Sequence, residues 1–459
     1  MNSTILKTPA SNHEPASSPL KSLLRTSLPA VIDLASQTVM WTVESILIGK
    51  LSAAAFGGVG MALQVIILFM TIMLTFVVGS TLIITRYLGA GDKWNANHIL
   101  SQALMLSVFM ACCLAVFWYF GATNIFKLIK EGSSSEAEHA GVTYLRTIAI
   151  FAPFIITNFI AVGIIRGAGE THFSMMINLG INGLNLMLAP ILIFGLFGFP
   201  RLEVRGAALA AGMCHTLGFF VTLYLLRSRK SVLFLSFREL TQPNLQTFKR
   251  LFKAGLPTTI EQLVWAFGML VMTSYIAVLG VHLLAAHQVF MRIQAILSML
   301  YMGFGMGAMT LMGKNLGAAD RRLAQHTAET SSWVMSGCVL VIVIVLIVFS
   351  RQVISIFTTD PEVIHIGIFV MRVFALAQIP KALDGVLMGN LRGAGDSRWL
   401  MWITIISVVF IEIGFNWLVA FVFKWSLLGL WIVHLIDETL RLAASYWRFK
   451  GGKWKFLHV

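Results

Sequence analysis

The chain has 459 residues, of which 57% are hydrophobic and 12% are charged, and its mean hydropathy is +0.82. Soluble domains carry about a quarter charged residues, so this chain has too few charges to coat the two or three soluble domains that its length would require. The composition excludes a soluble globular protein and indicates a membrane protein that crosses the bilayer several times.

Apolar runs of membrane-spanning length follow one another along the whole chain, separated by charged residues, glycine or proline. The runs are continuously apolar and do not alternate, which favours α-helices over the strands of a β-barrel. We therefore expect an all-α membrane protein with twelve transmembrane helices. They are predicted near residues 27–49, 54–86, 96–120, 140–164, 171–197, 206–227, 250–279, 283–314, 321–350, 362–389, 398–423 and 427–448.

Lysine and arginine are concentrated on one side of this predicted topology, in the N-terminal tail, the long central loop and the C-terminal tail. Because cytoplasmic loops carry an excess of these residues, both termini are expected in the cytoplasm. The net charge of +14 is then a topology signal, and nucleic-acid binding is not needed to explain it. The predicted division is a disordered cytoplasmic tail at 1–22, an N-lobe of six spans at 23–230, a cytoplasmic linker at 231–249, a C-lobe of six spans at 250–448 and a cytoplasmic tail at 449–459.

The second half of the chain repeats motifs of the first half in the same order. "LPAVIDLAS" matches "LPTTIEQLV", "YLGAGDKWNA" matches "NLGAADRRLA", and "IRGAGETHFSMM" matches "LRGAGDSRWLMW". The matched positions are Pro29 and Pro257, Gly89 and Gly317, and Arg166 and Arg392, which lie 228, 228 and 226 residues apart. Six spans in each half make the repeats parallel, related by an axis along the membrane normal, as in several secondary transporters.

Many segments of this chain resemble the MATE (multidrug and toxic compound extrusion) family in family order, from about Leu23 to Trp454. They include "GIIRGAGETHFSMMINLGINGLNLMLAPILIFGLFG", "AGLPTTIEQLV", "AAHQVFMRIQ" and "GVLMGNLRGAGDSRWLMW". The resemblance implies a twelve-helix transporter whose two six-helix lobes enclose a central cleft. In that family organic cations leave the cell in exchange for Na⁺ or H⁺.

Several carboxylates fall inside predicted spans, where an ionisable side chain is expensive unless it serves a function or faces a partner. Such a group can bind a cationic substrate or load and release a proton, and competition between the two at one acid would produce antiport. The candidates for ion or proton coupling are Glu44, Glu261, Asp33 and Asn185. Asp33 is the repeat equivalent of Glu261. The structural alternatives for these two acids are exposure to water at the cytoplasmic end, or pairing of Asp33 with Arg25 and of Glu261 with Lys253.

The resemblance also implies where a Na⁺ site would lie in the N-lobe. One branch of the family builds it from a first-span acid, an Asn and an Asp four residues apart in the fifth span, and a Thr in the sixth. Glu44 and Asn185 fit this pattern, but Ala189 stands at the Asp position and an alanine near Ala211 at the Thr position. Because Na⁺ needs several oxygen ligands, H⁺ is the expected coupling ion, and no cofactor or bound metal is expected.

A second branch of the family has an acid in the tenth span, where this chain has Lys381 followed by Asp384. Their i,i+3 spacing favours a salt bridge between them, whereas an unpaired Lys381 would favour an anionic substrate. Glu412 and Asp437 are expected to be structural partners of Arg441 or Arg372. The candidate substrate-binding residues are Lys381, Asp384, Trp41, Met40, Phe267, Tyr301 and Met302.

The predicted function is secondary antiport that exports amphipathic, cationic small molecules in exchange for H⁺ or Na⁺. No catalytic constellation supports an enzyme. The expected partners are small-molecule substrates and the lipid bilayer, without nucleic acid, and the chain is expected to be a monomer in the plasma (inner) membrane. Two alternatives stay open: a related exporter of an anionic metabolite or lipid-linked substrate, and a non-transporting membrane scaffold.

Overall fold

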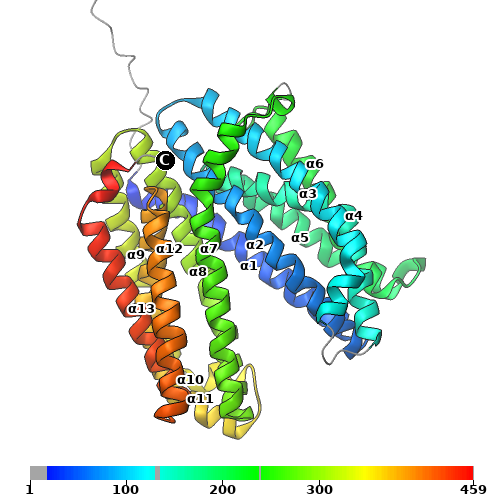
Figure 1. The fold of residues 1–459 in the computed structure, drawn as a ribbon, viewed down its shortest axis with the longest axis vertical. Coiled ribbons are helices and arrows are strands. Elements are labelled where there is room, and N and C mark those ends of the chain that lie inside the picture. The colour runs from blue at the N-terminus through cyan, green and yellow to red at the C-terminus, as the bar shows by residue number, and fades with distance from the viewer. Residues whose placement is uncertain (1–17, 130–134, 237–238, 458–459) are drawn as a thin grey trace, which may run out of the picture.

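The computed structural model describes residues 18–129, 135–236 and 239–457, and these residues are almost entirely helical. Six long helices form the first half of the chain, with one short turn, η1, between the last two (Figure 1). They are α1 (Pro19–Gly49), α2 (Ala53–Gly89), α3 (Lys93–Ile129), α4 (Ser135–Gly167), α5 (Thr171–Phe194), η1 (Leu196–Gly198) and α6 (Glu203–Arg227).

The second half repeats this arrangement with more irregular ends. Its α-helices are α7 (Leu245–Leu279), α8 (Val281–Gly317), α9 (Arg321–Val348), α10 (Ser350–Ser355), α11 (Pro361–Gly393), α12 (Ser397–Ile406) and α13 (Leu427–Lys450). Short turns are η2 (Glu239–Thr241) and η5 (Lys453–Phe456), and α12 continues in two π-helical segments, η3 (Ser407–Phe415) and η4 (Leu418–Val422). Because π-helical turns are rare and are frequent at functional sites, η3 is a segment of interest.

Among the described residues, eleven helices have the length and apolar composition to cross a membrane. They correspond to the first eleven predicted spans. The twelfth, α13, has 24 residues, as many as α5, but it carries Asp437, Glu438 and Arg441 close together. The chain is therefore a multi-pass, all-helical membrane protein, and its last span is set apart by buried charge.

Two helices begin inside segments that the sequence assigns to the N-terminal tail and to the linker. Ser18 caps α1, where its side chain accepts a hydrogen bond from the backbone N–H of Lys21, so residues 19–22, expected in a disordered tail, are helical. Asn244 caps α7 in the same way, so residues 245–249, expected in the linker, are helical too. The rest of the predicted tail, residues 1–17, lies outside the described residues.

The two halves form two bundles, α1–α6 and α7–α13, which are seen side by side in Figure 1. Each bundle has its own core of buried apolar side chains. Those of the first bundle lie between Ile48 and Leu235 in the sequence, and those of the second between Met272 and Val433. Leu251 of α7 packs into the N-lobe core and Leu23 of α1 packs into the C-lobe core. These two leucines are repeat equivalents, 228 residues apart, so each lobe extends its first helix against the other lobe.

The lobes touch each other through α1, α2, α7 and α8 at one end of the molecule. There Gly89 of α2 packs against α8, where an added Cβ would lie 2.0 Å from the Lys314 carbonyl oxygen. Gly317 of α8 packs against α2 in the same way, 2.2 Å from the Arg86 carbonyl oxygen. Because only glycine permits this approach, the repeat-equivalent glycines allow the two lobes to close on each other.

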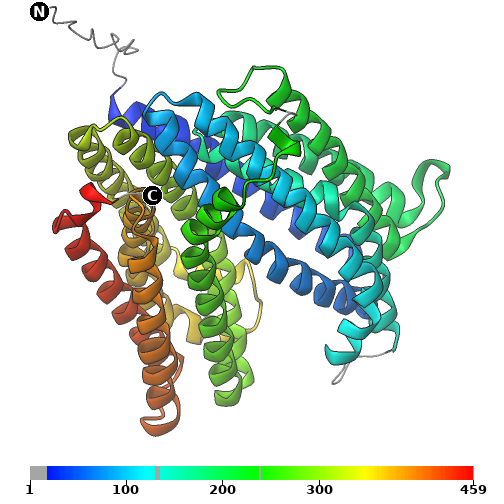
Figure 2. The same ribbon diagram turned by 45° about the horizontal axis from the view of Figure 1, so that its top comes forward.

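This closed end carries the start of α1, the segment between α6 and α7, and the end of the chain (Figures 1 and 2). The far ends of the lobes diverge in both views. Two cations reach across the closed end. Arg86 donates from Nη2 to the Ala394 carbonyl oxygen at 3.0 Å, and Nζ of its repeat equivalent Lys314 lies against Gly169. Each lobe therefore reaches the glycine-rich turn of the other.

Candidate functional site

Asp33 is a buried carboxylate of the N-lobe that is fully compensated by its partners. Arg166 of α4 donates from Nη2 to its Oδ2 at 2.6 Å. Two side chains of α5 add to this, Ser174 to Oδ2 at 3.0 Å and Asn178 to Oδ1 at 2.8 Å. Arg25, the partner considered from the sequence, does not form this ion pair, which instead ties α1 to α4 and α5.

Glu261 holds the equivalent position in the C-lobe. Arg392 of α11 donates from Nη2 to both of its carboxylate oxygens, at 2.8 and 2.9 Å. Lys253, the alternative considered from the sequence, is not the partner. The repeat-matched acids and arginines of the sequence thus pair with each other inside each lobe. A carboxylate that already pairs with a guanidinium links two helices and is not free to bind a substrate cation.

Glu44, the third predicted coupling acid, lies in an environment different from that of Asp33 and Glu261. It is buried on α1, and the hydroxyl of Tyr144 on α4 donates to its Oε1 at 3.2 Å. Among the described residues no basic side chain pairs with it. Glu44 therefore lies in the N-lobe beside a neutral partner, unlike Asp33 and Glu261.

Asn185 and its surroundings are poor in oxygen ligands. Its Nδ2 lies 3.3 Å from Sδ of Met40, one helical turn before Glu44, while its buried Oδ1 has no hydrogen-bond partner among the described residues. Ala189, and Ala211 near the sixth-span position that the resemblance implies, are buried apolar side chains. Among these residues, only Glu44 offers a carboxyl and only Asn185 an unpaired amide oxygen.

The C-lobe interior holds a chain of ionisable side chains from three elements. Lys381 of α11 pairs with Glu438 of α13. His434, one turn earlier on α13, lies with Nδ1 2.5 Å from Oε1 of Glu412 in η3 and with Nε2 3.6 Å from Oε1 of Glu438. Asn416 donates to the other oxygen of Glu412 at 3.2 Å.

Next to this chain lies a second set of charges. Arg441 Nε lies 3.7 Å from Oδ2 of Asp384, and Ser407 donates to Oδ1 of Asp437 at 2.5 Å. The predicted i,i+3 salt bridge between Lys381 and Asp384 is therefore wrong, because each residue faces a partner on α13. Counting four carboxylates against Lys381 and Arg441, the cluster keeps two excess negative charges when His434 is neutral.

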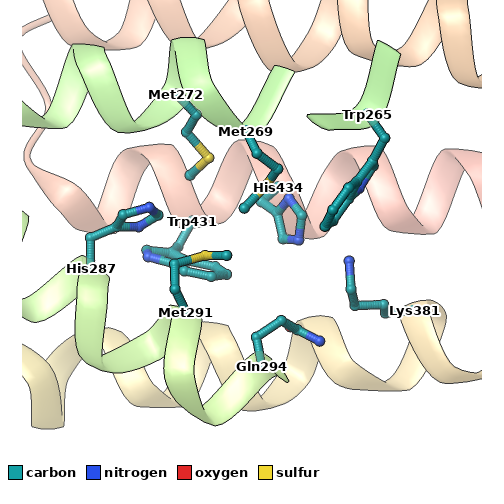
Figure 3. A pocket seen from close by; sticks show the side chains of 9 residues that line it. All are labelled: Trp265, Met269, Met272, His287, Met291, Gln294, Lys381, Trp431 and His434. Atoms are coloured by element: carbon teal, nitrogen blue, oxygen red, sulfur yellow. The ribbon is translucent and has the colours of Figure 1, made fainter. Parts of the chain in front are cut away.

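A small cavity of about 10 Å³ lies beside this cluster, between α7, α8, α11 and α13 (Figure 3). A volume of this size holds about one water molecule, so it is too small for an organic substrate. Its lining consists of Trp265, Met269, Met272, His287, Met291, Gln294, Lys381, Trp431 and His434. Of the predicted substrate-binding residues, only Lys381 lines this cavity within the described part of the chain.

The other predicted substrate-binding residues fall into two groups. Met40 and Tyr301 are buried, and the Tyr301 hydroxyl donates to Gln378 at 3.3 Å. Trp41, Phe267 and Met302 are all more than half exposed, at 55%, 58% and 56%. These residues stay predictions, because the structure does not gather them into one pocket among the described residues.

Sequence reasoning missed the residues of α13 that organise the C-lobe cluster. His434, Glu438, Arg441 and Ser445 recur every three or four residues, which places them on one face of a helix. All four are buried. This polar stripe inside a predicted span was the available signal.

Two lobes related by an internal repeat, with buried charges in both, are the arrangement of a two-lobe membrane transporter. The MatE family model matches residues 29–191 and 257–418, one match in each lobe. The chain belongs to the MatE, or MATE, family.

Relatives and solved structures match nearly the whole chain. A probable multidrug resistance protein, NorM, of Thermotoga maritima is 27% identical over 438 residues, covering 95% of this chain and 93% of the relative. The multidrug export protein MepA of Staphylococcus haemolyticus is 25% identical and covers 83% of each chain. An outward-facing multidrug resistance MATE transporter has the same fold, with a TM-score of 0.87, 21% identity and coverage of 96% of this chain and 98% of that one.

Proposed function

We propose that this protein exports amphipathic organic cations from the cell by exchange for protons, and that Glu44 is the coupling carboxyl of the N-lobe. The observation that carries this proposal is the burial of Glu44 beside a neutral hydroxyl, without a described cationic partner. A proton or a substrate cation can each supply the missing positive charge, so the two compete for one group. Asp33 and Glu261 already have that charge from Arg166 and Arg392.

The chemistry around Glu44 favours H⁺ over Na⁺. A sodium site needs several oxygen ligands, and Ala189 and Ala211 supply none from α5 and α6. A carboxyl that exchanges a proton needs no such set. The names of the relatives NorM and MepA, a probable multidrug resistance protein and a multidrug export protein, support a broad range of substrates for this chain.

The excess of negative charge in the C-lobe supports a cationic substrate. The alternative of an anionic or lipid-linked substrate depended on an unpaired Lys381, and Lys381 pairs with Glu438. We propose that the chain acts as a monomer in the cell membrane. With the positive-inside orientation, both termini lie in the cytoplasm, and the end at which the lobes are closed is the cytoplasmic one. Export would then follow from rocking of the two lobes about this contact.

The test is transport by purified protein in liposomes, using ethidium as a fluorescent cation and carboxyfluorescein as an anionic control. A pH gradient or a Na⁺ gradient is imposed separately. We expect the pH gradient to drive ethidium, and Glu44→Gln to abolish that movement. Glu136→Gln, the same change at an exposed residue of α4, is the matched control and should keep wild-type transport.

Three results would overturn the proposal. Movement driven only by Na⁺ would exclude proton coupling. Wild-type transport by folded Glu44→Gln would remove Glu44 from the mechanism. Movement of carboxyfluorescein without ethidium would establish the anionic alternative.

A further inference from the structure

The C-lobe contains a titratable group that the proposed role of Glu44 does not use. His434 is buried on α13 between two carboxylates, with Nδ1 2.5 Å from Glu412 and Nε2 3.6 Å from Glu438. Histidine is the side chain whose charge changes most readily near neutral pH. A buried imidazole between two acids is an arrangement that can hold a proton or give it up.

His434 is one of the residues that line the cavity of Figure 3. His287, whose side chain reaches this cavity from α8, is fully buried, and neither of its ring nitrogens has a hydrogen-bond partner among the described residues. Nε1 of Trp431, another lining residue, is also unpaired there. Because buried polar atoms are nearly always bonded to protein or water, and because the volume of about 10 Å³ suits one water molecule, the cavity is a hydration site beside His434.

We propose that His434 and Glu412 form a second proton-carrying site, located in the C-lobe and separate from Glu44. In the release step the His434 imidazolium gives its Nε2 proton to a water molecule in the cavity, while the Nδ1 proton stays on the ring and faces ionised Glu412. The net charge of the cluster then changes from one negative to two negative. Uptake of a proton is the reverse of this step.

Charged and titratable groups surround His434, and Glu261 of α7 interacts with Asp384 and Arg441 at the edge of this cluster. That helix contributes only the uncharged Trp265, Met269 and Met272 to the cavity wall. The facing groups are Glu412 of η3, Lys381 of α11, Glu438 of α13 and His287 of α8, with Asp437, Arg441 and Asp384 beyond them.

Loss of the proton changes the contacts that hold these elements together. Neutral His434 still donates from Nδ1 to Glu412, which also keeps the amide of Asn416. Glu438 keeps Lys381, but both acids lose the positive charge that lay between them. The attachment of η3 to α13 is thereby weakened, and η3 is π-helical. The proton on His434 would therefore bias the packing of the last two spans against each other during the transport cycle.

This inference rests on the proposed proton-driven export, so the experiment reads the two sites separately. Purified protein in weakly buffered detergent is titrated with ethidium, and a pH-indicator dye reports protons released per ethidium bound. Linkage of substrate and proton binding predicts about two protons for the wild type. Glu44→Gln, His434→Gln and Glu412→Gln should each release about one, and Glu44→Gln combined with His434→Gln should release about none.

His139→Gln, at an exposed position on α4, is the matched control and should behave as the wild type. Size-exclusion chromatography verifies folding, and Glu412→Gln tests the site without altering the imidazole. Wild-type proton release by both C-lobe variants would overturn this inference and leave Glu44 in place. Wild-type release by Glu44→Gln with reduced release by His434→Gln would instead overturn the Glu44 proposal and support the C-lobe site.

Discussion

The two lobes share a scaffold and differ in the charges that it encloses. In both, an acid near the middle of the first helix pairs with an arginine in the last turn of a later helix, Asp33 with Arg166 and Glu261 with Arg392. Beyond these pairs the N-lobe holds Glu44 beside a tyrosine hydroxyl. The C-lobe holds a connected cluster from α11, η3 and α13.

This difference separates structure from function within one repeat. Pairs that recur at equivalent positions fix the helices of each lobe and need not take part in transport. Groups without a counterpart in the other lobe, such as Glu44 and His434, are the ones available to specialise. An asymmetric pair of proton sites would allow the two lobes to respond separately to the same gradient.

The largest effect is expected from removing the arginine of a recurring pair. Arg392→Met leaves Glu261 buried without its guanidinium partner, which costs roughly 3–5 kcal/mol of the free energy of unfolding. Arg166→Met should cost less, because Ser174 and Asn178 still donate to Asp33. Thermal unfolding of the purified variants in detergent measures both.

The double variant Glu261→Gln with Arg392→Met serves as the control, because it removes both charges. It should recover part of the lost stability. Equal melting temperatures for Arg166→Met and Arg392→Met would contradict the different support that the two acids receive.

An intermediate effect is expected at the contact between the lobes. Gly89→Ala places a methyl group 2.0 Å from a carbonyl oxygen of α8, and Gly317→Ala places one 2.2 Å from a carbonyl oxygen of α2. Overpacking of this kind costs about 1–3 kcal/mol, here against the closed form of this end. We expect both variants to slow ethidium transport in liposomes by similar factors.

Gly57→Ala on α2 and Gly337→Ala on α9 are matched controls, because an added methyl group meets no atom within 4 Å at either position. Both should transport as the wild type does. Slow transport by only one of Gly89→Ala and Gly317→Ala would show that the lobe contact is not used symmetrically.

Most of the fold could be predicted from the sequence, because hydrophobic length and an internal repeat are local or periodic signals. The nearly constant offset of the repeat matches Asp33 to Glu261 and Arg166 to Arg392. Their pairing within each lobe was not predicted, since it depends on how helices pack. Lys381 shows the limit: its nearest acid along the helix is Asp384, but its partner is Glu438, 57 residues away.

The environment of Glu44 was equally out of reach of the sequence. Its position inside a span was predicted, but the identity of its neighbour was not, because Tyr144 is 100 residues away. For the C-lobe, the spacing of His434, Glu438 and Arg441 on one helical face was a readable signal. Glu412, the partner of His434, lies in a π-helical segment. A π-helix has more residues per turn than an α-helix, so the α-helical period of the sequence does not predict which way Glu412 faces.

The smallest effect is expected from the one hydrogen bond that distinguishes Glu44. Tyr144→Phe removes the hydroxyl 3.2 Å from Oε1 and keeps the ring, so the loss is about 1 kcal/mol. Ethidium transport under a pH gradient should change by a few-fold without being lost, because the carboxyl itself remains. Tyr446→Phe, the same change at an exposed residue of α13, should have no effect. Complete loss of transport in folded Tyr144→Phe would move the essential role from the carboxyl of Glu44 to the hydroxyl beside it.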